Sequence, residues 1–219
     1  MTRIFSVRSL FAFALCAVAL RAAPPAPPPE SALQASIQLA DWKDIFAQLS
    51  APATRTAHFE ERRFFPFRKA PTILTGEIRI VPGRGLSLHY QQPLDYIVIV
   101  DARGVLMRDD HGRERTSPID PHAQAATSAL FHVLQFNLPK LEREFTLHGL
   151  RDHQLWTLGF EPRDSALDNL VGSIVVSGTA GTVSEIRLVK SGHQRIEIDL
   201  HDQQSGIAFT PADLARYFR

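Results

Sequence analysis

Apolar and polar side chains alternate along residues 74–110, and this stretch constrains the fold more than any other part of the chain. Ile78 and Ile80, for example, flank a charged residue. A period of two indicates a β-strand with one dry face and one wet face. The turn sequence Pro-Gly-Arg-Gly at 82–85 separates two such runs, and a wholly apolar run at 96–100 predicts a central strand covered on both sides. We therefore predict four short antiparallel strands in this stretch.

The same alternation occurs on both sides of residues 74–110. Further strands are predicted at 54–65, 144–149, 154–161, 172–178, 183–190 and 194–201, with a short last one at 207–209. About ten or eleven strands in sequential order make a long meander, which must curl or close to bury its apolar face and protect its edges. A barrel of that size tends to enclose a cavity, because its own side chains do not easily fill it.

Helical spacing of apolar residues predicts two main helices, at 30–49 and 121–136. Residues 138–144 add a further turn to the second, and shorter helical turns are predicted at 163–170 and 212–218. A helix placed between strands usually covers a sheet face or a barrel mouth. The polar stretch between residue 107 and the second helix is predicted to be a loop. The chain is therefore expected to be mainly β, with helices as a cover.

The side chains predicted to face the interior are almost entirely hydrocarbon. A cavity with that lining suits an acyl chain better than a sugar or a phosphate. The predicted cavity residues are Phe59, Ile78, Ile80, Leu88, Ile99, Met107, Leu130, Leu134, Trp156, Leu158 and Ile186.

The first 22 residues have the pattern of a secretory signal peptide. A positively charged start precedes an apolar run at 9–20, which is too short to span about 30 Å of hydrocarbon. Small residues at 22–23 offer a cleavage site, and an uncleaved membrane anchor is the alternative. Residues 23–30 are predicted to form a proline-rich linker, and 31–219 are expected to form the folded domain, exported by means of the cleaved signal peptide. The single cysteine, Cys16, lies in the apolar run, so the mature domain is expected to lack disulfides.

Catalytic and metal-binding motifs are missing from the sequence. The nine histidines form no HExxH pattern, and neither a GxSxG elbow nor a glycine-rich phosphate loop is present. The cluster Glu60-Glu61-Arg62-Arg63 is interpreted as strand-surface pairing rather than acid–base machinery. A formal net charge of +1 argues against a nucleic-acid partner. We predict a non-enzyme without metal or cofactor; a lipid-directed enzyme would need a nucleophile and base that the sequence does not reveal.

Five segments together resemble the LolA family of periplasmic outer-membrane lipoprotein carriers. They are AHFEERR (57–63), LTGEIRI (74–80) and the stretches 85–109, 129–147 and 153–189, and the resemblance extends over about residues 49–200. The family fold is an unclosed antiparallel β-barrel in which short helices form a lid over a hydrophobic cavity.

This resemblance implies a monomeric carrier that shuttles lipoproteins or lipids from an inner-membrane donor exporter to an outer-membrane acceptor. It also implies a lid-contact role for an arginine, which corresponds here to Arg84. The alternative on the same scaffold is a periplasmic sensor or interaction domain that carries no lipid.

Overall fold

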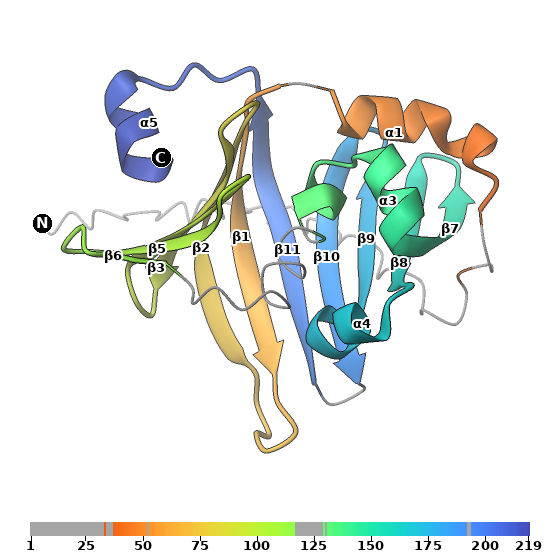
Figure 1. The fold of residues 1–219 in the computed structure, drawn as a ribbon, viewed down its shortest axis with the longest axis horizontal. Helices are drawn as coiled ribbons and strands as arrows, with labels where there is room; N and C mark the ends of the chain where they lie inside the picture. The colour runs from red at the N-terminus through yellow and green to blue at the C-terminus, as the bar shows by residue number, and fades with distance from the viewer. Residues whose placement is uncertain (1–32, 34–36, 52, 117–128, 130, 192–193) are drawn as a thin grey trace, which may run out of the picture.

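The structure, a computed structural model, describes residues 33, 37–51, 53–116, 129, 131–191 and 194–219 (Figure 1). The predicted signal peptide and proline-rich linker lie outside the described residues, as do Leu130 and most of the first half of the predicted helix 121–136.

One antiparallel sheet of eleven strands dominates the described chain. The strands are β1 (Arg55–Phe64), β2 (Thr72–Val81), β3 (Gly85–Gln92), β4 (Tyr96–Asp101), β5 (Gly104–Asp109), β6 (Glu114–Thr116), β7 (Phe145–Asp152), β8 (Leu155–Pro162), β9 (Ser173–Thr179), β10 (Thr182–Ser191) and β11 (Gln194–Ser205). Their spatial order is β6-β5-β4-β3-β2-β1-β11-β10-β9-β8-β7, so β6 and β7 are edges and the barrel does not close. The predicted fold class, an unclosed antiparallel barrel with short helices, is confirmed.

The helices are short and differ from the predicted ones in extent. They are η2 (Leu39–Trp42), α1 (Lys43–Leu49), α3 (Leu138–Glu144), α4 (Ser165–Val171) and α5 (Pro211–Tyr217), and residues 131–134 are also helical. The first predicted helix was wrong at residue 37, where the backbone N–H of Ile37 donates to the carbonyl of Leu147 on edge strand β7 at 3.1 Å. The strand predicted at 207–209 does not form, and β6 forms instead within the predicted loop.

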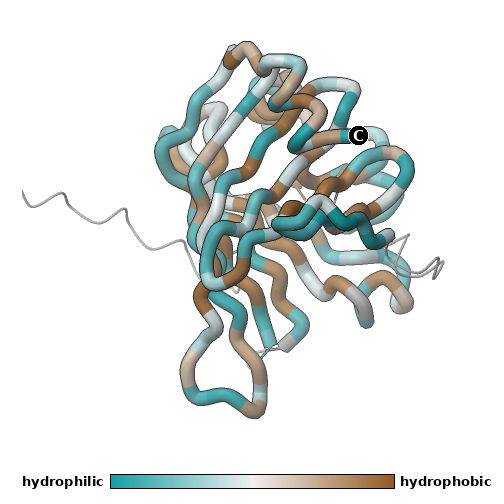
Figure 2. The backbone as a smooth tube through the Cα atoms, turned by 90° about the vertical axis from the view of Figure 1, so that its left-hand side faces the viewer, coloured by the Kyte–Doolittle hydropathy of each residue, from teal (hydrophilic) through white to brown (hydrophobic). Residues whose placement is uncertain are grey.

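The pairing register places one column of apolar residues on the inner face of the curled sheet. Ala57, Ile78, Leu88, Val98 and Met107 lie opposite one another across β1 to β5. Opposite residues in an antiparallel ladder point to the same side. This column therefore marks the concave surface, and Figure 2 shows hydrophobic and hydrophilic positions alternating along these strands.

Helices cover one half of the inner face, over β7 to β10 (Figure 1). Trp42 and Phe46 from the N-terminal helices and Phe136 pack with Trp156 and Leu158, all of them 6% exposed or less. Phe136 contacts Phe46 and Trp156 edge-on, with ring centroids 6.3 and 6.4 Å apart. The part of the interior over β7 and β8 is filled by the protein's own side chains.

The C-terminal helix α5 covers the outer face of β3 to β5. Its residues Tyr217 and Phe218 are buried with Ile97, Ile99 and Leu106. A capping box starts the helix, because the Thr210 hydroxyl accepts from the Asp213 backbone N–H at 3.1 Å and the Asp213 carboxylate accepts from the Thr210 N–H at 3.0 Å.

Two arginines fasten α5 to the sheet. The guanidinium of Arg219 donates to both carboxylate oxygens of Asp101 at 2.6 and 2.7 Å. The guanidinium of Arg79 on β2 lies 3.7 Å from the ring centroid of Tyr217, a cation–π contact. Helix α5 is thus held by packing, a bidentate ion pair and a stacked arginine.

Replacing Phe218 by alanine should lower the free energy of unfolding by about 3–5 kcal/mol, because the ring is 1% exposed and leaves a cavity between α5 and the sheet. Urea denaturation measures the loss. Phe67→Ala is the matched control, since that ring is 81% exposed and its removal should change the free energy by less than about 0.5 kcal/mol. Equal losses in the two variants would show that α5 is not part of the cooperative fold.

The Asp101–Arg219 pair should make stability depend on acid pH. Burial raises the pKa of Asp101, but hydrogen bonds from Arg219 and Arg103 outweigh it and lower that pKa to about 2. A lowered pKa stabilises the fold above the unfolded value of about 3.9, and this stabilisation is lost as the pH falls towards 2.

Asp101→Asn should therefore lower the free energy of unfolding by roughly 2 kcal/mol at pH 7, with the difference from the native chain disappearing near pH 2. Urea titrations at several pH values measure this difference. Asp152→Asn, at a carboxylate with 75% of its side chain exposed, is the control and should leave the profile unchanged. A constant difference between Asp101→Asn and the native chain over the whole pH range would contradict the role given to this pair.

Candidate functional site

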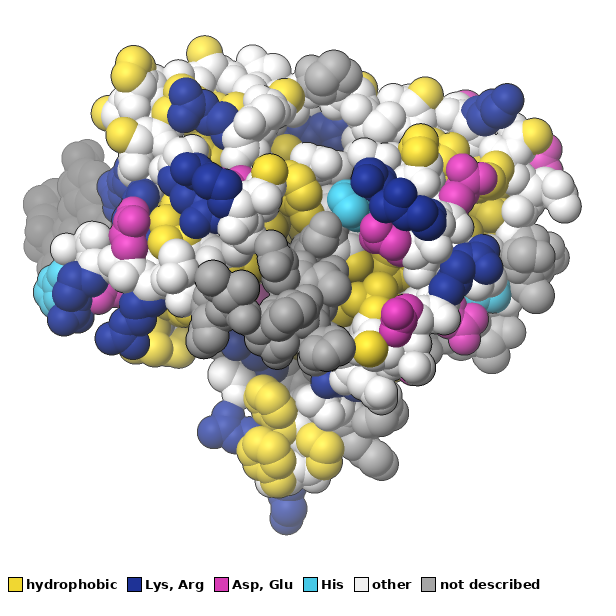
Figure 3. Space-filling view, viewed as in Figure 1, with side chains coloured by type: hydrophobic (Ala, Val, Ile, Leu, Met, Phe, Trp, Pro, Cys, Tyr) yellow, Lys and Arg dark blue, Asp and Glu magenta, His cyan; other side chains and the backbone are white. Residues whose placement is uncertain are grey.

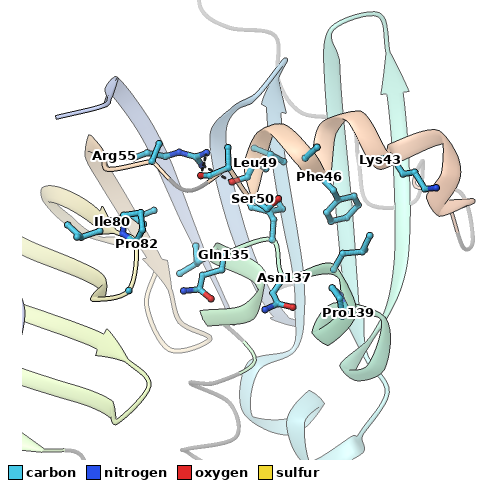
Figure 4. Close-up of a pocket in the computed structure, with 18 residues that line it drawn as sticks. Lys43, Phe46, Leu49, Ser50, Arg55, Ile80, Pro82, Gln135, Asn137 and Pro139 are labelled. Atoms are coloured by element: carbon cyan, nitrogen blue, oxygen red, sulfur yellow. Dashed lines mark hydrogen bonds between the residues drawn. The ribbon is translucent and has the colours of Figure 1, made fainter. Parts of the chain in front are cut away.

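A cavity of about 570 Å³ lies between the end of α1, the segment 134–139 and the turn that joins β2 to β3. Figure 4 shows Ile80 and Pro82 on one side of this space, with α1 and residues 135–139 on the other. Its lining is Lys43, Phe46, Ala47, Leu49, Ser50, Ala51, Ala53, Arg55, Ile80, Val81, Pro82, Gly83, Leu134, Gln135, Phe136, Asn137, Leu138 and Pro139. We call this space the outer cavity.

A smaller cavity of about 170 Å³, the inner cavity, lies against the concave face of the sheet. It is lined by Arg55, Thr56, Ala57, Ile78, Ile80, Val133, Leu134, Phe136, Val176, Gly181, Thr182, Val183, Ile186, Leu200, Gln203 and Ser205. Arg55, Ile80, Leu134 and Phe136 line both cavities, so the two spaces adjoin. The sheet supplies one wall and the segment 133–136 supplies the other.

Phe136 is held in an unusual backbone conformation where the two cavities meet. Its φ is 50°, a left-handed value that bulky residues seldom adopt. The residue joins the helical turn at 131–134 to α3, and His132 Nδ1 lies 2.9 Å from Glu144 Oε2 across this connection. The surrounding aromatic packing over-determines this conformation and fixes one wall of the site.

The charged side chains that line the two cavities are both cations. Lys43 and Arg55 are the only charged residues in the two linings, within the described part of the chain. The Arg55 guanidinium donates to the carbonyls of Leu49 at 2.9 Å and Gln48 at 3.1 Å, at the C-terminal end of α1. Burial lowers the pKa of Arg55, yet an arginine stays charged in proteins. The positive charge is therefore placed at the junction of the cavities by helix capping.

A buried polar cluster occupies the other end of the inner face. Glu61, 3% exposed, accepts a hydrogen bond from the Tyr90 hydroxyl at 2.6 Å and another from the Arg63 guanidinium. The rings of Tyr90 and Tyr96 stack with centroids 4.5 Å apart, and Phe59 meets Tyr90 edge-on at 5.2 Å. Burial raises the pKa of Tyr90, and the neighbouring carboxylate raises it further. The carboxylate of Glu61 is thus paired and hydrogen-bonded inside an otherwise apolar surface.

The sequence interpretation of Glu60-Glu61-Arg62-Arg63 as surface pairing holds for half of this cluster. Glu60 and Arg62 lie on the outer face, where the Arg62 guanidinium contacts Glu60 at 3.1 Å and Asp199 at 2.7 Å. Glu61 and Arg63 instead point inward. Glu61 lies two residues after Phe59 and four after Ala57 on β1, and this spacing of two indicates that all three side chains point to the same face.

Four of the predicted cavity residues, Ile78, Ile80, Leu134 and Ile186, line the cavities. The other predicted residues are placed elsewhere. Phe59, Trp156 and Leu158 are on the inner face but 2% exposed or less, packed in the core. Leu88 is partly buried on the same face, Met107 is 45% exposed at its margin, and Leu130 lies outside the described residues.

Two predicted residues point away from the cavities. Ile99 is on the outer face, fully buried beneath α5, because the wholly apolar strand β4 gave no alternation from which to assign its faces. Arg84 is an exposed residue of the β2–β3 turn, and its neighbours Pro82 and Gly83 line the outer cavity instead. The lid-contact role implied for Arg84 stays a prediction, and the cations that line the cavities, Arg55 and Lys43, were not among the predicted residues.

Groups of three or more histidine, cysteine, aspartate or glutamate side chains placed to hold a metal ion are absent from the described part of the chain. Among the described helices, none is both long enough and apolar enough to span a membrane.

No family model matches the chain, and no curated protein matches it in sequence. Solved structures share its fold at low identity. An uncharacterised conserved protein of Thermus thermophilus is 10% identical with a TM-score of 0.49, covering 82% of this chain and 94% of that one. MucB, in the Pseudomonas aeruginosa MucA/MucB complex, is 15% identical with a TM-score of 0.44, covering 80% of this chain and 59% of that one.

A LolA superfamily protein of Nitrosomonas europaea is also similar, at 5% identity and a TM-score of 0.41, covering 78% of this chain and 96% of that one. The chain spans 59% of the MucB chains that it matches. At these identities the likeness is one of fold alone, so function must be inferred from this chain's own residues.

Tyr90→Phe should lower the free energy of unfolding by about 1–3 kcal/mol, because the buried carboxylate of Glu61 loses a donor that water cannot replace. Urea denaturation at pH 7 measures the loss. Tyr217→Phe is the matched control: that ring is also buried, and its hydroxyl has no hydrogen bond to another described residue, so the expected change is under about 0.5 kcal/mol. A Tyr90→Phe variant as stable as the control would show that water or another group satisfies Glu61.

Proposed function

We propose that the protein binds an acyl chain of a lipid or lipoprotein in the outer and inner cavities and carries it through the periplasm between the inner and outer membranes. The observation that carries this proposal is the lining itself. Two adjoining cavities are walled mainly by hydrocarbon, contain no acidic residue among the described lining, and carry two cations, Lys43 and Arg55.

The sizes of the cavities suit such a guest. Ligand pockets usually measure about 300–1,000 Å³, and the outer cavity measures about 570 Å³. Apolar cavities of roughly 150 Å³ already hold benzene-sized guests, and the inner cavity is about 170 Å³. A chain that enters from the outer cavity would reach the concave face at Ala57 and Ile78.

The cations of the linings support an orientation of the guest. An acyl chain would lie along Ile80 and Leu134, with its polar or anionic head near Arg55, since Lys43 lies at the other end of α1 (Figure 4). A carboxylate or phosphate gains charge-assisted hydrogen bonds from such groups, whereas the hydrocarbon interior offers it none.

The segment 133–136 is the proposed lid. It separates the outer cavity from the inner one, and Leu134 and Phe136 contact both spaces. Cargo longer than the present cavities would require this segment to shift, as lids do in other binding proteins.

A second candidate, an interaction or sensor domain without lipid cargo, is favoured by one observation. Trp42, Phe136 and Leu158 fill the interior over β7 and β8, so the scaffold is partly solid without a guest. On this alternative the purified protein would retain a protein partner and no lipid.

Binding affinity should rise with the length of the acyl chain, because each buried methylene contributes about 0.8 kcal/mol, roughly fourfold in Kd. Fluorescence displacement with saturated fatty acids of increasing length measures the trend. Ala57→Phe should abolish it by filling the inner cavity, and Leu134→Ser should weaken binding by removing apolar lining. Ala102→Phe, at an exposed turn residue, is the matched control and should bind as the native chain does.

Native mass spectrometry of the protein purified from its own periplasm distinguishes the two candidates. Bound lipid that is lost in Ala57→Phe supports the carrier. Circular dichroism checks that Ala57→Phe stays folded. If the native protein carries no lipid and its affinity does not change with acyl-chain length, the carrier function is overturned and the interaction domain remains.

A further inference from the structure

The hairpin that joins β1 to β2 projects beyond the rest of the sheet. Its tip, residues 65–71, extends past the ends of the neighbouring strands in Figures 1 and 2. Figure 3 shows hydrophobic side chains gathered on this projection, with Lys or Arg side chains at its end. We call residues 65–71 the hairpin tip.

The hairpin tip exposes aromatic surface that the fold does not use. Phe67 is 81% exposed, and its ring stacks on Phe65 with centroids 5.4 Å apart. Ile73, the second residue of β2, is also exposed, with 53% of its surface accessible. Contiguous exposed apolar groups of this kind mark sites of interaction. The strand that leads into the tip is held in the sheet. Phe64, the last residue of β1, pairs with Arg195 on β11, and the Arg195 guanidinium lies 3.7 Å from the Phe64 ring centroid.

The charge around these rings is entirely positive. Arg68 and Lys69 are exposed, and the sequence has no acidic residue between Glu61 and Glu77. Within the described part of the chain, no carboxylate is within 4.0 Å of the Arg68 or Lys69 side chain. The Arg68 guanidinium donates to the Thr72 hydroxyl, at 2.5 Å, while its backbone N–H donates to the Phe65 carbonyl within the turn. Both charges are therefore available to an anionic partner.

We propose that the hairpin tip docks the protein on an anionic bilayer, with Phe65 and Phe67 inserted at the headgroup level and Arg68 and Lys69 on lipid phosphates. Apolar side chains combined with flanking cations are what binding at a membrane interface requires. A protein partner fits less well, because stable interfaces bury about 800 Å² on each side and a seven-residue tip cannot supply that area alone.

This docking is separate from cargo binding in the cavities. The hairpin tip precedes β2, whereas Ile80 to Gly83, at the other end of β2, line the outer cavity. A strand of ten residues separates the two features, about 30 Å at the rise of an extended chain. The proposal therefore stands or fails independently of the carrier function.

Vesicle sedimentation with the full chain tests the proposal. The native protein should bind vesicles of phosphatidylcholine with one-third phosphatidylglycerol at least tenfold more tightly than vesicles of phosphatidylcholine alone, and high salt should weaken this binding. Phe67→Ser should lower the partition by tenfold or more, and the double variant Arg68→Gln/Lys69→Gln should lower it about as much on the anionic vesicles only.

Matched controls are available at sites away from the hairpin tip. Leu155→Ser removes another exposed apolar side chain, and Arg84→Gln removes an exposed turn cation; neither should change the partition. Ala57→Phe blocks the inner cavity and should bind vesicles as the native chain does, which separates docking from cargo binding. All substituted tip residues are surface residues, so thermal unfolding should be unchanged.

Phe67→Trp gives a direct readout of insertion. Its indole should be quenched by spin-labelled lipids, whereas Trp42 and Trp156, 6% and 2% exposed, should not be. Equal vesicle binding by the native chain and Phe67→Ser would overturn the proposal. The proposal would also be overturned if spin-labelled lipids did not quench the fluorescence of Phe67→Trp. It would fail as well if the hairpin tip bound a protein partner and the native chain bound no vesicles.

Discussion

Pairing between β1 and β11 holds the two halves of this molecule together. Without it the chain would form two separate meanders, β1 to β6 and β7 to β11. The ladder runs antiparallel from Arg55–Ser205 to Phe64–Arg195, and a register shift between Thr56 and His58 marks a bulge. Bulges increase local twist and bend the strand that carries them. The same ladder places Leu200 opposite Phe59 and brings the floor of the inner cavity together from strands more than 100 residues apart in sequence.

Local patterns in the sequence were sufficient to predict nearly all strands, because alternation is a property of consecutive residues. They could not assign Ile99 to a face, since the strand around it is apolar on both sides and both sides are indeed covered. The inward position of Glu61 was predictable from its alternation with Phe59, but its partners Tyr90 and Tyr96 come from two other strands.

The two cations of the cavity linings were beyond prediction for a related reason. Arg55 is positioned by carbonyl groups at the end of α1, and Lys43 lines the outer cavity because α1 lies beside it. Neither relation leaves a periodic signature. Long-range contacts of this kind depend on how helices dock, and the sequence pattern only says that a covering helix exists.

The filled and hollow halves of the interior have different physical roles. Gly149 on β7 allows the ring of Trp42 to lie directly on the strand, and a Cβ at that position would overlap the ring. Such close packing fixes the N-terminal helices on the sheet. A close-packed interior is hardly compressible, so a shift of one side chain moves its neighbours. The segment 133–136 spans the border, with Val133 buried in the filled half and Leu134 packed against both halves. A guest entering the cavities would therefore press first on Leu134, which is only partly buried, while Val133 behind it stays held in the packed interior.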